Sequence, residues 1–266
     1  QNTENVNLLK TKDYNIFSVL QIQSKEVLIC RMIADLLNPR GQHGAGAEYL
    51  KIFLRDCLGM EKMDTKLADQ AIVTAEYAID DERRIDIVIE MGSYFLPIEV
   101  KIYAADQKSQ CFDYYQYAKR RDAQAKVYYL TLDGHRPGKD STSSGSQSVP
   151  EEDIVCLSFR EHILNWLKAC KNCGNTGMIP ILEQFIRNIE QISGYTSERV
   201  RNMVIDELLT SGDSLRAGMQ IADSINAAKA KLIYQVMEEF EKQLAGVAEK
   251  NHWTREKNSN WYEYKE

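Results

Sequence analysis

The clearest alternation of apolar and polar residues runs from Arg84 to Lys101, as RIDIVIEMGSYFLPIEVK. Period-two alternation predicts β-strands, and Gly92-Ser93 suits a two-residue turn between them. The hairpin has an apolar face that contains Ile85, Ile87, Ile89, Leu96, Ile98 and Val100. The opposite face contains Arg84, Asp86, Val88, Glu90, Pro97, Glu99 and Lys101. With this turn, Met91 opposes Tyr94, Ile85 opposes Val100, and Asp86 lies directly across from Glu99.

Helical periodicity surrounds this hairpin. Before it we expect a helix capped by Ser24 that runs to Leu37, a second helix over residues 47–58, and a strand over 70–79. After it we expect a helix over 104–121, with strands over 126–132 and 153–159. The stretch 133–153 is rich in Ser, Gly and Pro, which predicts a long mobile loop. From residue 160 onwards the pattern is helical, over 160–170, 178–192, 197–209 and 213–248.

These elements predict an α/β (α+β) fold whose mixed central sheet is flanked by helices. We place the core with its N-terminal helices at residues 1–160, and a helical extension packed on that core at 161–266. A chain of 266 residues can bury a substantial hydrophobic core. The long helix that begins near Asp213 is a candidate for homodimer formation.

Composition limits the function classes. The net charge of −6 argues against a broadly basic nucleic-acid-binding surface but leaves room for a local positive groove. The six cysteines show no disulfide-scaffold spacing, and the lone Cys170-x-x-Cys173 pair does not predict a zinc site. We find no targeting segment and no transmembrane run, so we expect no membrane association and a cytoplasmic setting.

The candidate chemistry lies on the polar face of the hairpin. Two facing carboxylates, Asp86 and Glu99, repel unless a positive group lies between them. A divalent cation such as Mg²⁺ prefers oxygen ligands and is often held by one or two carboxylates together with substrate phosphate. Lys101 follows on the same face, where it can orient or deprotonate water or offset charge on a phosphate. The alternative is a salt-bridge cluster in which Arg84 or Lys101 neutralises both acids.

Two helices supply further candidates. Glu26 shares a helical face with apolar residues of the first helix, although a glutamate in a first turn can also simply favour the helix dipole. After the hairpin, Gln110 and Tyr114 line one side of a helix together with Gln107 and Tyr117. That face can present amide and phenol groups to the metal site or to phosphate, or it can be an ordinary polar helix face with half-packed tyrosines.

The motifs in this order resemble the PD-(D/E)XK nuclease superfamily, whose αβββαβ core is restriction-endonuclease-like and holds a divalent metal. Asp86, Glu99 and Lys101 match the motif acids and lysine, Gln110-x-x-x-Tyr114 resembles the Gln-x3-Tyr motif of one branch, and Glu26 matches the glutamate of the first core helix. Ile85 stands where the family name has proline. The resemblance covers residues 24–160 and is closest to a bacterial group of uncharacterised PD-(D/E)XK-like domains.

This resemblance implies a nuclease that depends on Mg²⁺ or Mn²⁺, with nucleic acid, DNA above all, as the expected partner. Asp86, Glu99 and the Val100 carbonyl would hold the metal, with Glu26 acting through water. Lys101 would assist water attack, and Gln110 and Tyr114 would position the substrate strand. The alternative is a nuclease-fold module that binds nucleic acid or a protein partner without cleaving.

Overall fold

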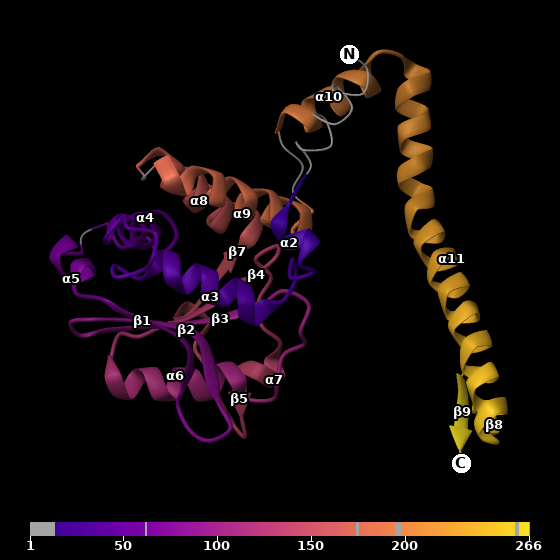
Figure 1. Cartoon of the computed structure of the whole chain (residues 1–266), viewed down its shortest axis with the longest axis horizontal. Coiled ribbons are helices and arrows are strands. Elements are labelled where there is room, and N and C mark those ends of the chain that lie inside the picture. Colours follow the sequence, from indigo (N-terminus) through magenta and orange to yellow (C-terminus); the bar gives the residue numbers. More distant parts are fainter. Residues whose placement is uncertain (1–13, 62, 174–175, 195–197, 259–260, 266) are drawn as a thin grey trace. The chain divides into compact units, whose positions relative to one another are not determined.

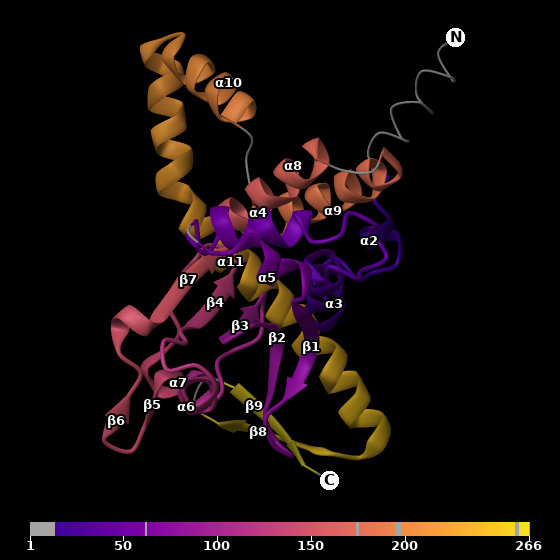
Figure 2. The ribbon, with the colours of Figure 1, turned by 90° about the vertical axis from the view of Figure 1, so that its left-hand side faces the viewer.

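The computed structural model describes residues 14–61, 63–173, 176–194, 198–258 and 261–265. A five-stranded sheet with the order β1-β2-β3-β4-β7 lies at its centre (Figure 2). Its strands are β1 (Ile72–Ala78), β2 (Arg84–Met91), β3 (Tyr94–Lys101), β4 (Val127–Thr131) and β7 (Ile154–Ser158). The first three strands pair in antiparallel fashion, whereas β3, β4 and β7 are parallel. This mixed sheet confirms the predicted fold class.

Helices cover both faces of the sheet (Figure 1). One face carries α3 (Glu26–Leu37), α4 (Glu48–Asp56), α8 (Leu164–Asn172) and α9 (Ile179–Ile192), and the other carries α6 (Gln110–Arg121). The short helices α2 (Ile16–Val19) and α5 (Thr65–Asp69) complete the N-terminal part. Each face has its own cluster of buried apolar side chains, because every sheet residue points to one side or the other.

The first compact unit spans residues 1–195, beyond the boundary that we expected at residue 160. Helices α8 and α9 belong to it because they complete the core on the α3 side. Trp166 of α8 is fully buried, packs edge-on against Phe53 of α4 and donates its indole N–H to the Tyr49 carbonyl over 2.8 Å. Packing of the remaining extension on this core stays a prediction.

The β2–β3 hairpin has the predicted register from Met91–Tyr94 to Ile87–Ile98. Gly92 in its turn has φ of +58°, a conformation that glycine adopts without strain. The predicted apolar face is wrong at Ile85, which packs on the α6 side, away from Ile87 and Ile89. Strand β1 changes face at the same level: Glu76, with φ of +54°, separates Ala75 on the α3 side from Tyr77 on the α6 side.

Other segments differ from the sequence-based expectations. Helix α3 begins at Glu26, and its cap residue is Lys25 rather than Ser24. Helix α6 begins only at Gln110, because residues 104–109 form an irregular loop. The predicted long loop after β4 contains the short helix α7 (Lys139–Thr142) and a small hairpin of β5 (Ser143–Ser144) and β6 (Gln147–Ser148).

The second unit spans residues 196–266. It contains α10 (Glu198–Leu209), the 40-residue helix α11 (Gly212–Asn251), and a hairpin of β8 (Thr254–Asn258) and β9 (Trp261–Lys265). Many large apolar residues of α11 are exposed, among them Leu232, Val236 and Phe240. Homodimer formation through this helix stays a prediction. None of the helices in the described residues is long and apolar enough to span a membrane.

Candidate active site

The backbone ladder between β2 and β3 ends where the predicted acids begin. Its last pair is Ile87 with Ile98, so Asp86 and Glu99 do not form the ladder pair that the sequence predicts. The N–H of Val100 instead donates to Oδ2 of Asp86 over 2.8 Å. A side-chain carboxylate therefore replaces the backbone acceptor at this end of the hairpin. Burial raises the pKa of Asp86, although the Val100 N–H partly offsets this effect.

Glu99 is the most deeply buried acid of the site, with only 1% of its side chain exposed. One carboxylate oxygen, Oε1, lies 2.5 Å from Nζ of Lys101. The other oxygen, Oε2, is buried and accepts no hydrogen bond from an N–H or O–H group of the described residues, while the Asp86 carboxyl group lies within hydrogen-bonding reach of the Glu99 side chain. Burial and then the charge of Asp86 raise the pKa of Glu99 well above its usual range. Ionised Glu99 is therefore costly in the metal-free protein, and a cation beside Oε2 would offset that cost.

Lys101 is also buried, with 8% of its side chain exposed. Burial alone would lower its pKa, but the charges of Glu99 and Asp86 outweigh that effect and raise it. Lys101 is therefore an ammonium ion in this arrangement. Arg84 has an exposed side chain and forms no ion pair among the described residues, so it does not neutralise the acids. Lys101 pairs with Glu99, as the salt-bridge alternative allows.

Glu26 reaches the same region from the first turn of α3. Its Oε2 accepts a hydrogen bond from the Ile102 N–H over 2.8 Å, just past the end of β3. Two carboxylates thus accept hydrogen bonds from alternate backbone N–H groups, that of Val100 in β3 and that of Ile102 just after it. An acid on the core-facing side of α3 needs a polar partner, and for Glu26 this partner is the Ile102 N–H. The sequence alone could not identify that partner.

The donor set fits a hard divalent cation. Asp86 and Glu99 offer carboxylate oxygens, and one of these is buried and accepts no N–H or O–H hydrogen bond from the described residues. The N–H and C=O of a strand residue face the same neighbour, so the Val100 carbonyl faces the Asp86 side. Within the described part of the chain, no three His, Cys, Asp or Glu side chains converge on a metal position. Direct ligation by Glu26 is therefore not shown, and its action through water stays a prediction.

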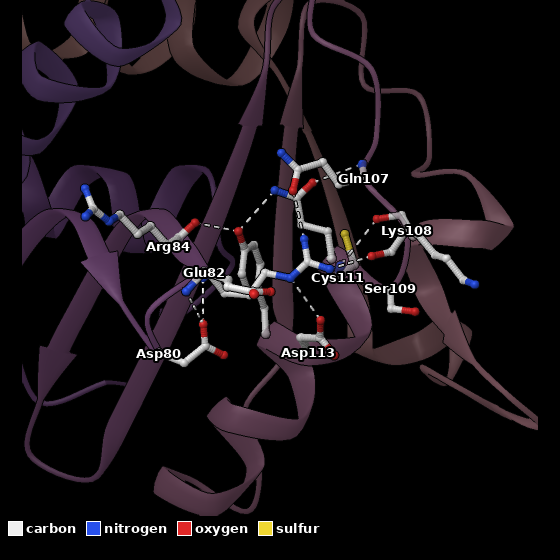
Figure 3. Close-up of polar contacts among 12 residues, drawn as sticks. Asp80, Glu82, Arg84, Gln107, Lys108, Ser109, Cys111 and Asp113 are labelled. Atoms are coloured by element: carbon white, nitrogen blue, oxygen red, sulfur yellow. Dashed lines mark hydrogen bonds and ion pairs between the residues drawn. The ribbon is translucent and has the colours of Figure 1, made fainter.

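Gln110 and Tyr114 lie side by side in α6, and both are buried, with exposed fractions of 5% and 1%. Nε2 of Gln110 donates to the Tyr114 hydroxyl over 3.0 Å, and that hydroxyl donates to the Arg84 carbonyl over 2.5 Å. In Figure 3 this carbonyl points into the polar cluster, whereas the Arg84 guanidinium points away. The pair therefore contacts the strand that carries Asp86 and is not exposed for direct contact with a substrate.

The sequence analysis did not identify Arg83, a second residue that positions α6. Arg83 donates from Nε to Asp113 over 3.1 Å, from Nη1 to Gln107 over 2.8 Å and from Nη2 to the Lys108 carbonyl over 2.6 Å (Figure 3). Its guanidinium thus connects the start of β2 to the loop before α6 and to the helix itself. The adjacent Arg83-Arg84 pair before the first motif acid was the only sequence signal for it.

The comparisons with known proteins place this geometry in a family. A family model described as the PD-(D/E)XK nuclease superfamily matches residues 14–188, which is more than half of the chain. The protein therefore belongs to the PD-(D/E)XK nuclease superfamily, as its motifs and sheet order indicate. No curated protein and no solved structure matches the chain. The matched region includes α8 and most of α9, in agreement with their place in the first compact unit.

Proposed function

We propose that this protein is a nuclease that depends on Mg²⁺ or Mn²⁺ and hydrolyses phosphodiester bonds in DNA. The observation that carries the proposal is the buried Oε2 of Glu99, which accepts no N–H or O–H hydrogen bond from the described residues, in a site that contains a second carboxylate, that of Asp86. Asp86, Glu99 and the Val100 carbonyl would hold the ion, with Glu26 contributing through water. When bound, such an ion polarises phosphate oxygens and lowers the pKa of water.

Lys101 supplies the positive charge of the chain itself at this point. Because its pKa is raised, it is protonated, which favours an ammonium role over that of a general base. In hydrolysis a water oxygen bonds to phosphorus as the bond from phosphorus to the leaving oxygen breaks. One proton of the water passes to solvent, and the leaving oxygen takes up a proton from solvent to become a hydroxyl group. The ammonium of Lys101 would orient this water and stabilise the negative charge that develops on the phosphate.

Gln110 and Tyr114 would act as positioning residues. Their hydrogen bonds end on the Arg84 carbonyl, two residues before Asp86. A fixed β2 backbone keeps the Asp86 carboxylate aligned with the Val100 N–H, and small displacements at such sites cost activity. This role replaces the direct contact with the substrate strand that the sequence suggested, because both side chains are buried.

The test is cleavage of supercoiled, linear and single-stranded DNA, and of RNA, by the parent protein in Mg²⁺ or Mn²⁺, with chelator as a control. We expect Lys101→Ala and Glu99→Gln each to lower the rate by about 100-fold or more. Lys66→Ala is the matched control, because Asp64-x-Lys66 repeats the motif spacing on an exposed surface outside the site.

Two results would contradict the proposal. Cleavage by Lys101→Ala or Glu99→Gln at the parent rate would remove these residues from the chemistry. Absence of cleavage by the parent in either metal, with nucleic acid still bound, would favour the module that binds without cutting. Isothermal titration of the metal alone separates these cases, since a binding module has no need for Mg²⁺ or Mn²⁺ at Asp86 and Glu99.

A further inference from the structure

Among the described residues of the first unit, Tyr103 is the most exposed large apolar side chain, with 69% of its surface accessible. It follows the motif strand directly, two residues after Lys101 and next to Ile102, whose N–H binds Glu26. An aromatic ring usually packs at least one face against the protein, since it has a large apolar area to bury. The ring of Tyr103 is therefore exposed to solvent at the residue next to Ile102, whose N–H binds Glu26 of the candidate site.

The backbone that carries Tyr103 is held on both sides. Before it, Ile102 is buried in the core and bonded to Glu26 over 2.8 Å. After it, the two carboxylate oxygens of Asp106 accept from the Tyr129 hydroxyl over 2.6 Å and from the Gly138 N–H over 2.7 Å. Only residues 103–105 lie between these anchors, so the ring is presented from a short, fixed loop. Such a position suits recognition better than a freely moving surface tyrosine does.

The negative charge of the chain favours an uncharged source of affinity, such as an aromatic ring. The chain carries a net charge of −6, and the acids Glu26, Asp86 and Glu99 outnumber Lys101 around the end of β3. Phosphate attraction normally supplies most of the sequence-independent affinity for nucleic acid, and a chain with a net charge of −6 has no overall positive charge to provide it. Stacking of bases on aromatic rings is the other general source of affinity for single strands, and it does not depend on net charge.

We propose that the ring of Tyr103 stacks on an unpaired nucleobase next to the phosphate that the candidate active site binds. The substrate is therefore single-stranded nucleic acid or a frayed end. In an intact duplex the faces of each base are covered by its neighbours, so an exposed ring finds a partner only where a base is unstacked. This inference rests on the proposed function, because it places the phosphate at Glu99 and Lys101.

The experiment uses the full chain with Lys101→Ala as background, so that the strand is not consumed. The probe is a single-stranded oligonucleotide with one 2-aminopurine, whose fluorescence falls when it stacks on an aromatic ring, and the competitor is the same sequence as a blunt duplex. We expect Tyr103→Leu to weaken single-strand binding about tenfold and to abolish the fluorescence change. Tyr103→Trp should retain both, and the duplex should compete weakly.

Tyr234→Leu is the matched control, since Tyr234 on α11 is 72% exposed and lies in the other unit. Equal binding by Tyr103→Leu and its background, an equal loss with Tyr234→Leu, or preference for the duplex would overturn the stacking proposal. A failure of the stacking proposal can be distinguished from a failure of the nuclease proposal. Cleavage that needs Lys101 but not Tyr103 would contradict stacking alone, whereas stacking without cleavage by the parent would contradict the nuclease alone.

Discussion

The two ends of the β2–β3 hairpin satisfy their backbone hydrogen-bonding groups in different ways. At the turn end, backbone groups pair with each other from Ile87–Ile98 to Met91–Tyr94, and most side chains are apolar and buried, with the half-buried Glu90 paired to Arg121. At the open end the ladder stops, and the carboxylates of Asp86 and Glu26 bind the N–H groups of Val100 and Ile102. The turn end thus stabilises the fold, whereas the open end concentrates buried charge that suits a cation. Stability and candidate chemistry are separated along one hairpin.

The largest effect on stability is expected at the turn end. Ile98 is 1% exposed and packs in the core on the α3 side. Ile98→Ala should lower the free energy of unfolding by about 2–5 kcal/mol, because it removes buried methyl groups and leaves a cavity. Urea denaturation measures the change. Ile72→Ala in β1 is the control, since Ile72 is 55% exposed and should cost much less. Equal losses at both positions would contradict the comparison.

The next effect concerns the contact between α6 and the open end. Tyr114→Phe removes the hydroxyl that bonds Gln110 and the Arg84 carbonyl, and it leaves both without this partner. We expect a loss of about 1–3 kcal/mol in unfolding free energy. If Tyr114 only stabilises the fold, the affinity of the folded variant for Mn²⁺ should be unchanged. If Tyr114 positions the site, the variant should bind Mn²⁺ more weakly than the parent. Tyr94→Phe at the turn end is the control, and it should alter neither quantity.

Asp86→Asn should act in the opposite direction. Asparagine keeps an oxygen that accepts from Val100 and removes the like charge beside Glu99. In the metal-free protein at neutral pH we expect a gain of about 1 kcal/mol in unfolding free energy, as is common when a functional site is relieved of strain. Thermal unfolding with and without Mn²⁺ checks this, and the stabilisation by metal seen in the parent should be lost in the variant.

The pH dependence of that gain has a definite sign. The folded pKa of Asp86 is raised, so its contribution to stability is present at low pH and is lost as pH rises through the folded pKa. The advantage of Asp86→Asn should therefore be full at neutral pH and disappear below about pH 4, where the unfolded carboxyl is also protonated. A gain that persists in acid would show that charge is not its cause.

The smallest effect is expected at the surface beside the open end. Arg31 of α3 pairs with Glu76 over 2.7 Å, but both side chains are substantially exposed. Arg31→Gln should change the free energy of unfolding by less than about 0.5 kcal/mol, because water screens such pairs. A loss above about 1 kcal/mol in urea denaturation would mean that this pair holds Glu76 in its left-handed conformation and hence supports the site.

The hairpin and its turn register follow from local sequence, because strand alternation and the Gly92-Ser93 turn are local properties. The family also follows from the sequence, since Asp86, Glu99 and Lys101 stand at fixed spacing within one hairpin. Helices α8 and α9 were predicted as helices, although their place in the core was not. The apolar face of a helix does not indicate which part of the protein it packs against.

The construction of the site depends on contacts between segments that are distant in the sequence. Ile85 packs on the face opposite to Ile87, at the level of the left-handed Glu76 in β1, and Glu26 meets Ile102 across 76 residues of sequence. Gln110 and Tyr114 are turned inward to a backbone carbonyl, where a helical-face argument allowed contact with substrate. These outcomes depend on which segments far apart in the chain lie side by side, and periodicity in one segment contains no information about its distant neighbours.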